Sequence, residues 1–172
     1  MSDPTTRERI LDVAEKLFAD NGFDGTSLRM ITGAADVNLA AVHYHFGSKV
    51  GLLKAAVRRR IDPVNAERLR RLDAVLAERG GRTPSVEEIV DCFVRPAIEA
   101  LSDVDPQHMM SMIGILHSRE IDQSFFEETF GPVIARFAIM REALPELPAA
   151  EIAWRFHFMI GVMLQAFNAR VD

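Results

Sequence analysis

Two short apolar-periodic segments joined by a tight turn occupy residues 26–49, and they end in the run AAVHYHFGSK. On a helix, where successive side chains are about 100° apart, Val42 and Phe46 fall on one side. The opposite side carries small, imidazole and phenol groups: Ala40, Ala41, His43 and Tyr44. We therefore expect Val42 and Phe46 to anchor this helix and its opposite side to contact a partner molecule.

Capping residues mark a helix before this segment. Thr5 and Glu8 form a capping box, and the apolar residues after them recur at helical spacing: Ile10, Val13, Ala14, Leu17 and Phe18. Asn21 and Gly22 end the predicted helix, because Gly22 suits a left-handed cap.

Three more helices are predicted from their caps. Thr26 or Ser27 caps the second helix, Asn38 caps the third, and Ser48 caps a fourth. A turn at residues 36–37 separates the second helix from the third. Helix, helix, tight turn and helix is the helix-turn-helix pattern.

The run HYHFGSK, from His43 to Lys49, resembles the DNA-binding domain of the TetR family of bacterial transcriptional regulators. The specific motifs of the resemblance cover roughly residues 5–60, and the rest of the chain is similar only in its helical layout. Two positions depart from the family pattern. Asp36 stands where Gly is usual in the turn, and His43 stands where an aromatic residue is commoner.

The resemblance implies an all-α fold with two domains. Residues 1–47 would form an N-terminal three-helix DNA-binding domain of helix-turn-helix type. Residues 48–172 would form a larger C-terminal helical domain for ligand binding and dimerisation. The pattern after residue 60 agrees, since no stretch shows sustained strand alternation. Helices are predicted after the capping box of Ser85 and Glu88, over residues 123–143, and over residues 149–171.

In such a domain the third helix lies in the major groove, which is about 12 Å wide, and flanking groups hold phosphates. Ala40 and Ala41 would meet thymine methyl groups, His43 would contact base edges, and Tyr44 and His45 would reach phosphates. The alternative is that Tyr44 and His45 pack against the first helix. The full predicted DNA-binding set is Thr26, Ser27, Arg29, Asn38, Leu39, Ala40, Ala41, His43, Tyr44, His45 and Lys49.

The distribution of charge fits contact with DNA at one end of the chain. The net charge is −5, but residues 1–60 hold nine Lys and Arg against seven Asp and Glu, whereas the remainder holds eleven against eighteen. Arg58, Arg59 and Arg60 contribute to the basic end, although they would equally suit a solvated helix face.

One domain of this size buries too little surface for tight specific binding, so two copies on half-sites about 34–36 Å apart are expected. The last predicted helix has an apolar surface wider than one core face requires, which favours burial on two sides. With residues 123–143 it would form a four-helix bundle across a two-fold axis, as in the family. The alternative is an ordinary core helix of a monomer. The predicted dimer interface is Phe137, Ile152, Phe156, Met159, Met163 and Phe167.

Methionine and phenylalanine between the two ends of the chain suit an adaptable apolar pocket, and they suit a plain core equally well. The predicted effector-binding residues are Phe93, Met109, Met112, Ile113, Leu116, His117, Phe126 and Phe130. His117 would be the polar anchor of the effector, or else a satisfied core or surface histidine.

Motifs for catalysis are absent from the sequence. It contains neither a glycine-rich phosphate loop nor an HExxH motif, and His43 and His45 diverge on a helix. Cys92 is the only cysteine, which excludes an intrachain disulfide and a cysteine-based zinc site. We therefore expect no enzymatic activity, no cofactor and no metal. The chain also lacks an apolar run near 18 residues and a basic-then-apolar leader, so we expect no membrane association and a cytoplasmic location.

These features together predict a ligand-responsive, homodimeric DNA-binding transcriptional regulator. It would act as a repressor that a small, mostly apolar effector releases from double-stranded operator DNA. One alternative is a helical-bundle enzyme or small-molecule carrier with a purely structural N-terminal domain. Another is a DNA-binding adaptor that has no effector and recognises proteins through its acidic body.

Overall fold

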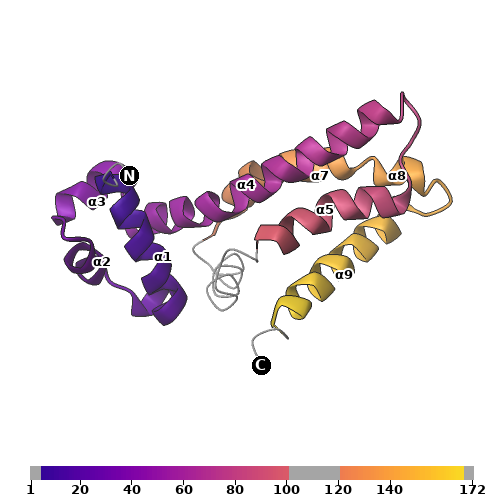
Figure 1. Ribbon diagram of the computed structural model, residues 1–172. Coiled ribbons are helices and arrows are strands. Elements are labelled where there is room, and N and C mark those ends of the chain that lie inside the picture. The colour runs from indigo at the N-terminus through magenta and orange to yellow at the C-terminus, as the bar shows by residue number, and fades with distance from the viewer. Residues whose placement is uncertain (1–4, 101–120, 169–172) are drawn as a thin grey trace. The chain divides into compact units, whose positions relative to one another are not determined.

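The computed structural model describes residues 5–100 and 121–168, with side chains described as far as Met163 in the last helix. Throughout that part of the chain the regular secondary structure is helical, which confirms the predicted all-α class (Figure 1). The helices in chain order are α1 (Thr6–Gly25), α2 (Leu28–Ala35), α3 (Leu39–Phe46), α4 (Lys49–Glu78), α5 (Val86–Ala100), α7 (Gln123–Phe137), α8 (Met140–Ala143) and α9 (Ala149–Asn168). None of these helices has the length and apolar character needed to cross a membrane.

The described chain packs as two compact units. The first unit holds residues 5–60 and 121–125, and the second holds residues 61–100 and 126–168. The boundary in α4 lies later than the predicted domain limit at residue 47, because the first turns of α4 belong to the core of the first unit. Where the DNA-binding and effector functions divide stays a prediction.

The first unit is built on α1, whose start follows the predicted capping box. The Thr5 N–H donates to Glu8 Oε2 at 2.8 Å, and the Glu8 N–H donates to Thr5 Oγ1 at 3.3 Å. The helix kinks at Gly22, which has φ 70°, and one more helical turn follows to Gly25. The core of this unit is formed by Ile10, Leu11, Ala14, Phe18, Ile31, Ala35, Val42, Leu52, Leu53, Ala56 and Val57.

Ion pairs join α4 to α1 within the first unit. Arg60 Nε donates to Glu15 Oε2 at 2.8 Å, and Arg59 Nη1 lies 2.6 Å from Asp12 Oδ1. Glu15 is a buried carboxylate, so its charge requires these partners. Arg59 and Arg60 therefore hold α4 against α1 rather than forming only a solvated face.

The second unit has its own core, made by α4, α5, α7, α8 and α9. Phe93 lies at its centre, with ring centroids 5.3 Å from Phe137 and 4.6 Å from Phe156. The core residues are Leu72, Ile89, Cys92, Phe93, Val133, Phe137, Met140 and Ile152. The predicted capping box of α5 is confirmed, since the Ser85 N–H donates to Glu88 Oε2 at 2.8 Å and the Glu88 N–H to Ser85 Oγ at 3.3 Å.

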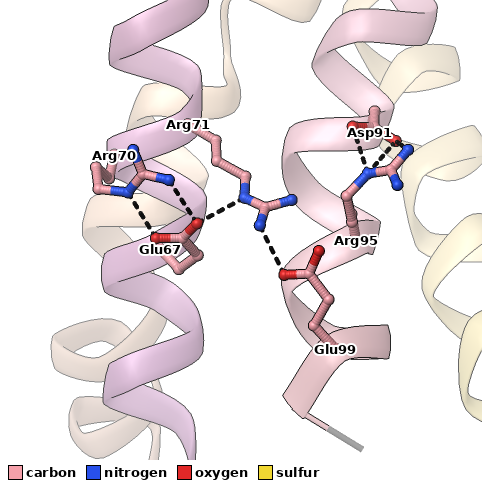
Figure 2. A network of polar contacts seen from close by, with 6 residues as sticks. All are labelled: Glu67, Arg70, Arg71, Asp91, Arg95 and Glu99. Atoms are coloured by element: carbon pink, nitrogen blue, oxygen red, sulfur yellow. Dashed lines mark hydrogen bonds and ion pairs between the residues drawn. The ribbon is translucent and has the colours of Figure 1, made fainter. Parts of the chain in front are cut away.

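Charged side chains link α4 to α5 on the surface of the second unit (Figure 2). Glu67 accepts hydrogen bonds from Arg70 and Arg71, each with a shortest distance of 2.7 Å, and Arg71 Nη2 also donates to Glu99 at 2.6 Å. These donors hold the pKa of Glu67 at about 2. Arg71 thus bridges the two helices, although exposed ion pairs of this kind each contribute little stability.

Candidate DNA-binding surface

The turn between α2 and α3 has the geometry that a helix-turn-helix requires. Ser27 caps α2, its Oγ accepting from the Met30 N–H at 3.2 Å. Asp36 ends α2 in the left-handed region, with φ 50° and ψ 55°, and its N–H donates to the Thr32 carbonyl. Asp is among the residues that tolerate this conformation, so the turn forms although the usual glycine is replaced.

Local interactions fix both ends of α3. Asn38 Oδ1 accepts from the Ala41 N–H at 2.9 Å, which confirms the predicted cap. At the other end, Gly47 has φ 74° and its N–H donates to the His43 carbonyl at 2.9 Å. Val42 is fully buried and Phe46 is half-buried, so these two side chains anchor the helix as predicted.

The opposite side of α3 is open to solvent. The exposed side chains of α3 are Ala40, His43 and Tyr44, together with Leu39 in its first turn, and we call these four the α3 outer face. Tyr44 is 85% exposed, and this excludes the alternative that its ring packs against α1. His45 is half-buried, with its ring centroid 5.0 Å from that of Tyr44.

A hydrogen bond sets the orientation of the His43 ring. His43 Nδ1 lies 2.9 Å from the Gly47 carbonyl oxygen. A carbonyl can only accept, so Nδ1 must carry the hydrogen in this contact. In the neutral imidazole the free Nε2 is then a hydrogen-bond acceptor on the α3 outer face.

The flanking residues divide into those that are open to solvent and one that is not. Ser27 and Arg29 are exposed, and Lys49 is half-buried with its Nζ 4.1 Å from the Phe23 ring centroid. Thr26 is only 1% exposed, and its hydroxyl lies 2.8 Å from the carbonyl oxygens of Leu17 and Gly22. Of these two predicted DNA-binding residues, Thr26 thus has its hydroxyl bound to the end of α1 and only Ser27 presents a hydroxyl to solvent; which of them contacts DNA stays a prediction.

The predicted effector-binding residues are not gathered in one place over the described chain. Phe93 belongs to the core of the second unit, whereas Phe126 is exposed and pairs with Phe130 at a centroid distance of 4.8 Å. The other predicted members lie outside the described residues: Met109, Met112, Ile113, Leu116 and His117. The predicted pocket thus stays a prediction.

The predicted dimer-interface residues lie on the inner side of the second unit. Phe137 and Ile152 are buried in its core, and Phe156, Met159 and Met163 pack half-buried against that core. The Phe167 side chain lies outside the described set. A different apolar stripe of α9, next to the predicted one, is open to solvent. In it Trp154 is 63% exposed, Phe158 66% and Val162 69%. We call these three residues the α9 outer stripe.

Two family models match the chain. The model for bacterial regulatory proteins of the tetR family matches residues 10–56, and a model for the tetracyclin repressor-like C-terminal domain matches residues 91–171. The first match contains the whole of α2, the turn and α3. The second contains most of α5, together with α7, α8 and α9.

Curated relatives match about a third of the chain. The protein named Probable HTH-type transcriptional regulator YttP, from Bacillus subtilis, is 43% identical over 53 residues, which are 31% of this chain and 26% of that protein. The negative transcriptional regulator IcaR of the biofilm operon icaADBC in Staphylococcus aureus is 34% identical over 59 residues, 34% of this chain and 32% of IcaR. The matched segment thus spans a third or less of the length of these relatives.

Similarity in structure extends over nearly the whole chain. A crystal structure from Shewanella sp. PV-4, assigned to the tetR family of transcription regulators, superimposes with a TM-score of 0.71 at 25% sequence identity. The superposition covers 98% of this chain and 87% of that one. With both family models matched and the helix-turn-helix in place, the chain belongs to the TetR family of bacterial transcriptional regulators.

Proposed function

We propose that the protein is a ligand-responsive transcriptional repressor that leaves its operator DNA when a small effector binds. The observation that carries this proposal is the α3 outer face, which is open to solvent on a helix fixed at both ends. The curated relatives that match about a third of the chain are named transcriptional regulators, and IcaR is named a negative one. A regulator of this kind needs no catalytic group. The proposed location is the cytoplasm, because the target DNA lies there.

The contacts that we propose with DNA follow from the chemistry of the exposed groups. Leu39 and Ala40 would contact thymine methyl groups, and the free Nε2 of His43 would accept from an exocyclic amino group of adenine or cytosine. Tyr44 and Ser27 would donate hydroxyl hydrogens to phosphates. We propose that Arg29, Lys49 and His45 contact the DNA backbone. The proposed DNA-binding surface also includes Asn38 and Ala41.

We propose that the repressor is a homodimer joined through the α9 outer stripe. Trp154, Phe158 and Val162 recur at i, i+4 and i+8, so they form one exposed apolar stripe along α9. Exposed aromatic side chains on a helix are unfavourable in water unless a partner covers them. A second copy supplies that partner and also provides the second DNA-binding unit that adjacent half-sites require.

The first test is a gel shift with DNA from the gene's own promoter at several salt concentrations. A repressor gives a specific band whose affinity falls as salt rises, because phosphate contacts release counterions. A helical-bundle enzyme or carrier gives no specific band, and that result would refute the proposal.

The dimer proposal is tested by Phe158→Glu. A charge in the α9 outer stripe should turn the dimer into a monomer in light-scattering measurements and weaken specific DNA binding, while helicity is unchanged. Glu151→Ala, which changes an exposed residue near the start of α9, is the matched control and should stay dimeric. A Phe158→Glu protein that is still dimeric would show that the interface lies elsewhere.

A further inference from the structure

One arginine on α4 is buried without an acidic partner among the residues that the structure describes. Arg68 is 6% exposed, its Nε donates to the Phe93 carbonyl at 2.8 Å, and its Nη1 donates to Asn65 Oδ1 at 3.1 Å. Its guanidinium carbon lies 3.9 Å from the Phe93 ring centroid. Among the described residues no carboxylate forms an ion pair with it, whereas several other arginines of α4 each pair with Asp or Glu: Arg59, Arg60, Arg70 and Arg71.

A buried guanidinium that contacts only neutral groups is costly. Burial lowers the pKa of Arg68 to about 10, so the side chain still carries its charge at neutral pH. Buried charges in proteins are normally paired, because removing an ion from water is strongly unfavourable. A guanidinium has five N–H donors, and the two bonds to Phe93 and Asn65 leave the others without a partner in the described chain.

The two neutral contacts explain how Arg68 is held, but not why the position carries a charge. Phe93 lies three residues before Pro96 in α5, and Thr129 lies three residues before Pro132 in α7. Prolines inside helices disturb the backbone hydrogen bonds of the preceding turn. Asn65 Nδ2 donates to the Thr129 carbonyl at 2.9 Å, so a neutral amide binds the carbonyl that precedes Pro132. A neutral side chain could likewise bind the Phe93 carbonyl without the cost of a buried charge.

A second polar group, linked to Arg68 through Asn65, is buried without a hydrogen bond in the described residues. The Thr129 side chain is 8% exposed, and its Oγ1 makes no hydrogen bond within the described part of the chain. This hydroxyl belongs to the same residue whose carbonyl binds Asn65. Leaving a buried hydroxyl without a hydrogen-bond partner is unfavourable. Arg68 thus supplies a cation against the Phe93 ring, and Thr129, whose carbonyl binds the same Asn65 that Arg68 contacts, supplies a hydroxyl donor.

We propose that Arg68 and Thr129 bind the carboxylate of the effector, so that the effector is an organic acid with an apolar body. Carboxylates match the planar donors of a guanidinium and form stronger hydrogen bonds with it than neutral groups do. The phenylalanine and aliphatic side chains around Phe93 suit the apolar part of such an acid. The inference rests on the proposed function, since it names the chemical class of the effector, and it puts the polar anchor at Arg68 rather than at His117.

Binding of decanoate and 4-phenylbutyrate to the full chain, measured by calorimetry and thermal shift, tests this inference. Decanamide and 4-phenylbutyramide are the neutral controls. We expect at least one acid to bind about tenfold or more tightly than its amide, because only the acid forms charge-assisted hydrogen bonds. Arg68→Gln should abolish that preference, and Thr129→Val should reduce it. Arg70→Gln is the matched control, because Arg70 is an exposed arginine of the same helix that already pairs with Glu67.

Equal binding of acids and amides, or no binding of either acid, would overturn the inference. The same holds if Arg68→Gln keeps the wild-type preference. Should Arg68→Gln fail to fold, Thr129→Val decides, and an unchanged preference in that variant counts against the proposal. A gel shift of the wild-type protein distinguishes failure of this inference from failure of the proposed function. DNA binding without discrimination between acid and amide removes only this inference, whereas acid binding without specific DNA binding removes the proposed function.

Discussion

Replacing Tyr44 by alanine should separate DNA binding from stability. The side chain is 85% exposed, so the substitution removes roughly 30 Å² of buried surface out of about 200 Å². At about 25 cal/mol/Å² this costs roughly 0.8 kcal/mol. Alanine favours the helix by roughly 0.5 kcal/mol over tyrosine, which offsets most of that loss. We therefore expect the melting temperature to change by only about 1 °C.

The effect on DNA binding should be much larger. Each protomer loses one hydrogen bond from Tyr44 to a phosphate, which contributes about 1.5 kcal/mol because the acceptor is charged. Two protomers lose about 3 kcal/mol together, which raises Kd on the order of 100-fold. The loss should be similar for promoter DNA and for unrelated DNA, since phosphate contacts carry no sequence information.

Fluorescence anisotropy at a series of salt concentrations is the assay. Tyr44→Phe removes only the hydroxyl and should reproduce most of the loss. Lys49→Gln provides a contrast, because removing a charge should reduce the slope of log Kobs against log salt by about 0.9 per protomer, while Tyr44→Ala leaves the slope unchanged. A Tyr44→Ala protein that unfolds would show that the ring is a core contact. One that binds both DNAs normally would show that Tyr44 does not reach the phosphates.

Three further predictions concern single side chains. His43→Ala should relax the preference at one base pair per half-site by about 1–3 kcal/mol, measured by competition with substituted operators, and uniform weakening would contradict the proposed base contact. Thr26→Val should lower the free energy of unfolding by about 1–2 kcal/mol in urea, while the folded protein still binds DNA, because only a buried hydrogen bond is lost. Glu67→Gln should lower the melting temperature above about pH 5, and the difference should disappear as the pH falls towards 2. The sign follows from the lowered pKa of Glu67, whose stabilising charge is complete above the unfolded value of about 4.3 and is lost on protonation. A difference that persists at pH 2 would show that the carboxylate is not responsible.

The predicted caps were correct because they depend on residues close together in the chain. Thr5 with Glu8, Ser27, Asn38, and Ser85 with Glu88 each act across three residues, so the sequence contains both partners of each bond. The same locality explains why the exposed side of α3 could be predicted. Val42 and Phe46 are one helical turn apart, and once they face the core, the position of Tyr44 follows.

Predictions that depend on tertiary packing were less successful. Thr26 and Ser27 are both good capping residues, and only the fold shows that the Thr26 hydroxyl bonds to the end of α1. On α9 the apolar surface is wide, and periodicity alone could not decide which edge faces α5. The structure places the edge with Ile152 and Phe156 inwards and leaves the α9 outer stripe exposed.

Arg68 illustrates why a binding group in the second unit could not be found from the sequence. It lies between Glu67 and a run of further arginines, where helical spacing favours surface ion pairs, and Arg70 and Arg71 do form them. Arg68 differs only because the carbonyl of Phe93 and the side chain of Asn65 meet it from the interior. Phe93 lies in α5, 25 residues from Arg68 in the chain, and no local pattern brings the two together. Whether an arginine is buried without a counter-ion therefore depends on tertiary packing. The same feature distinguishes Arg68, the proposed carboxylate-binding residue, from its surface neighbours.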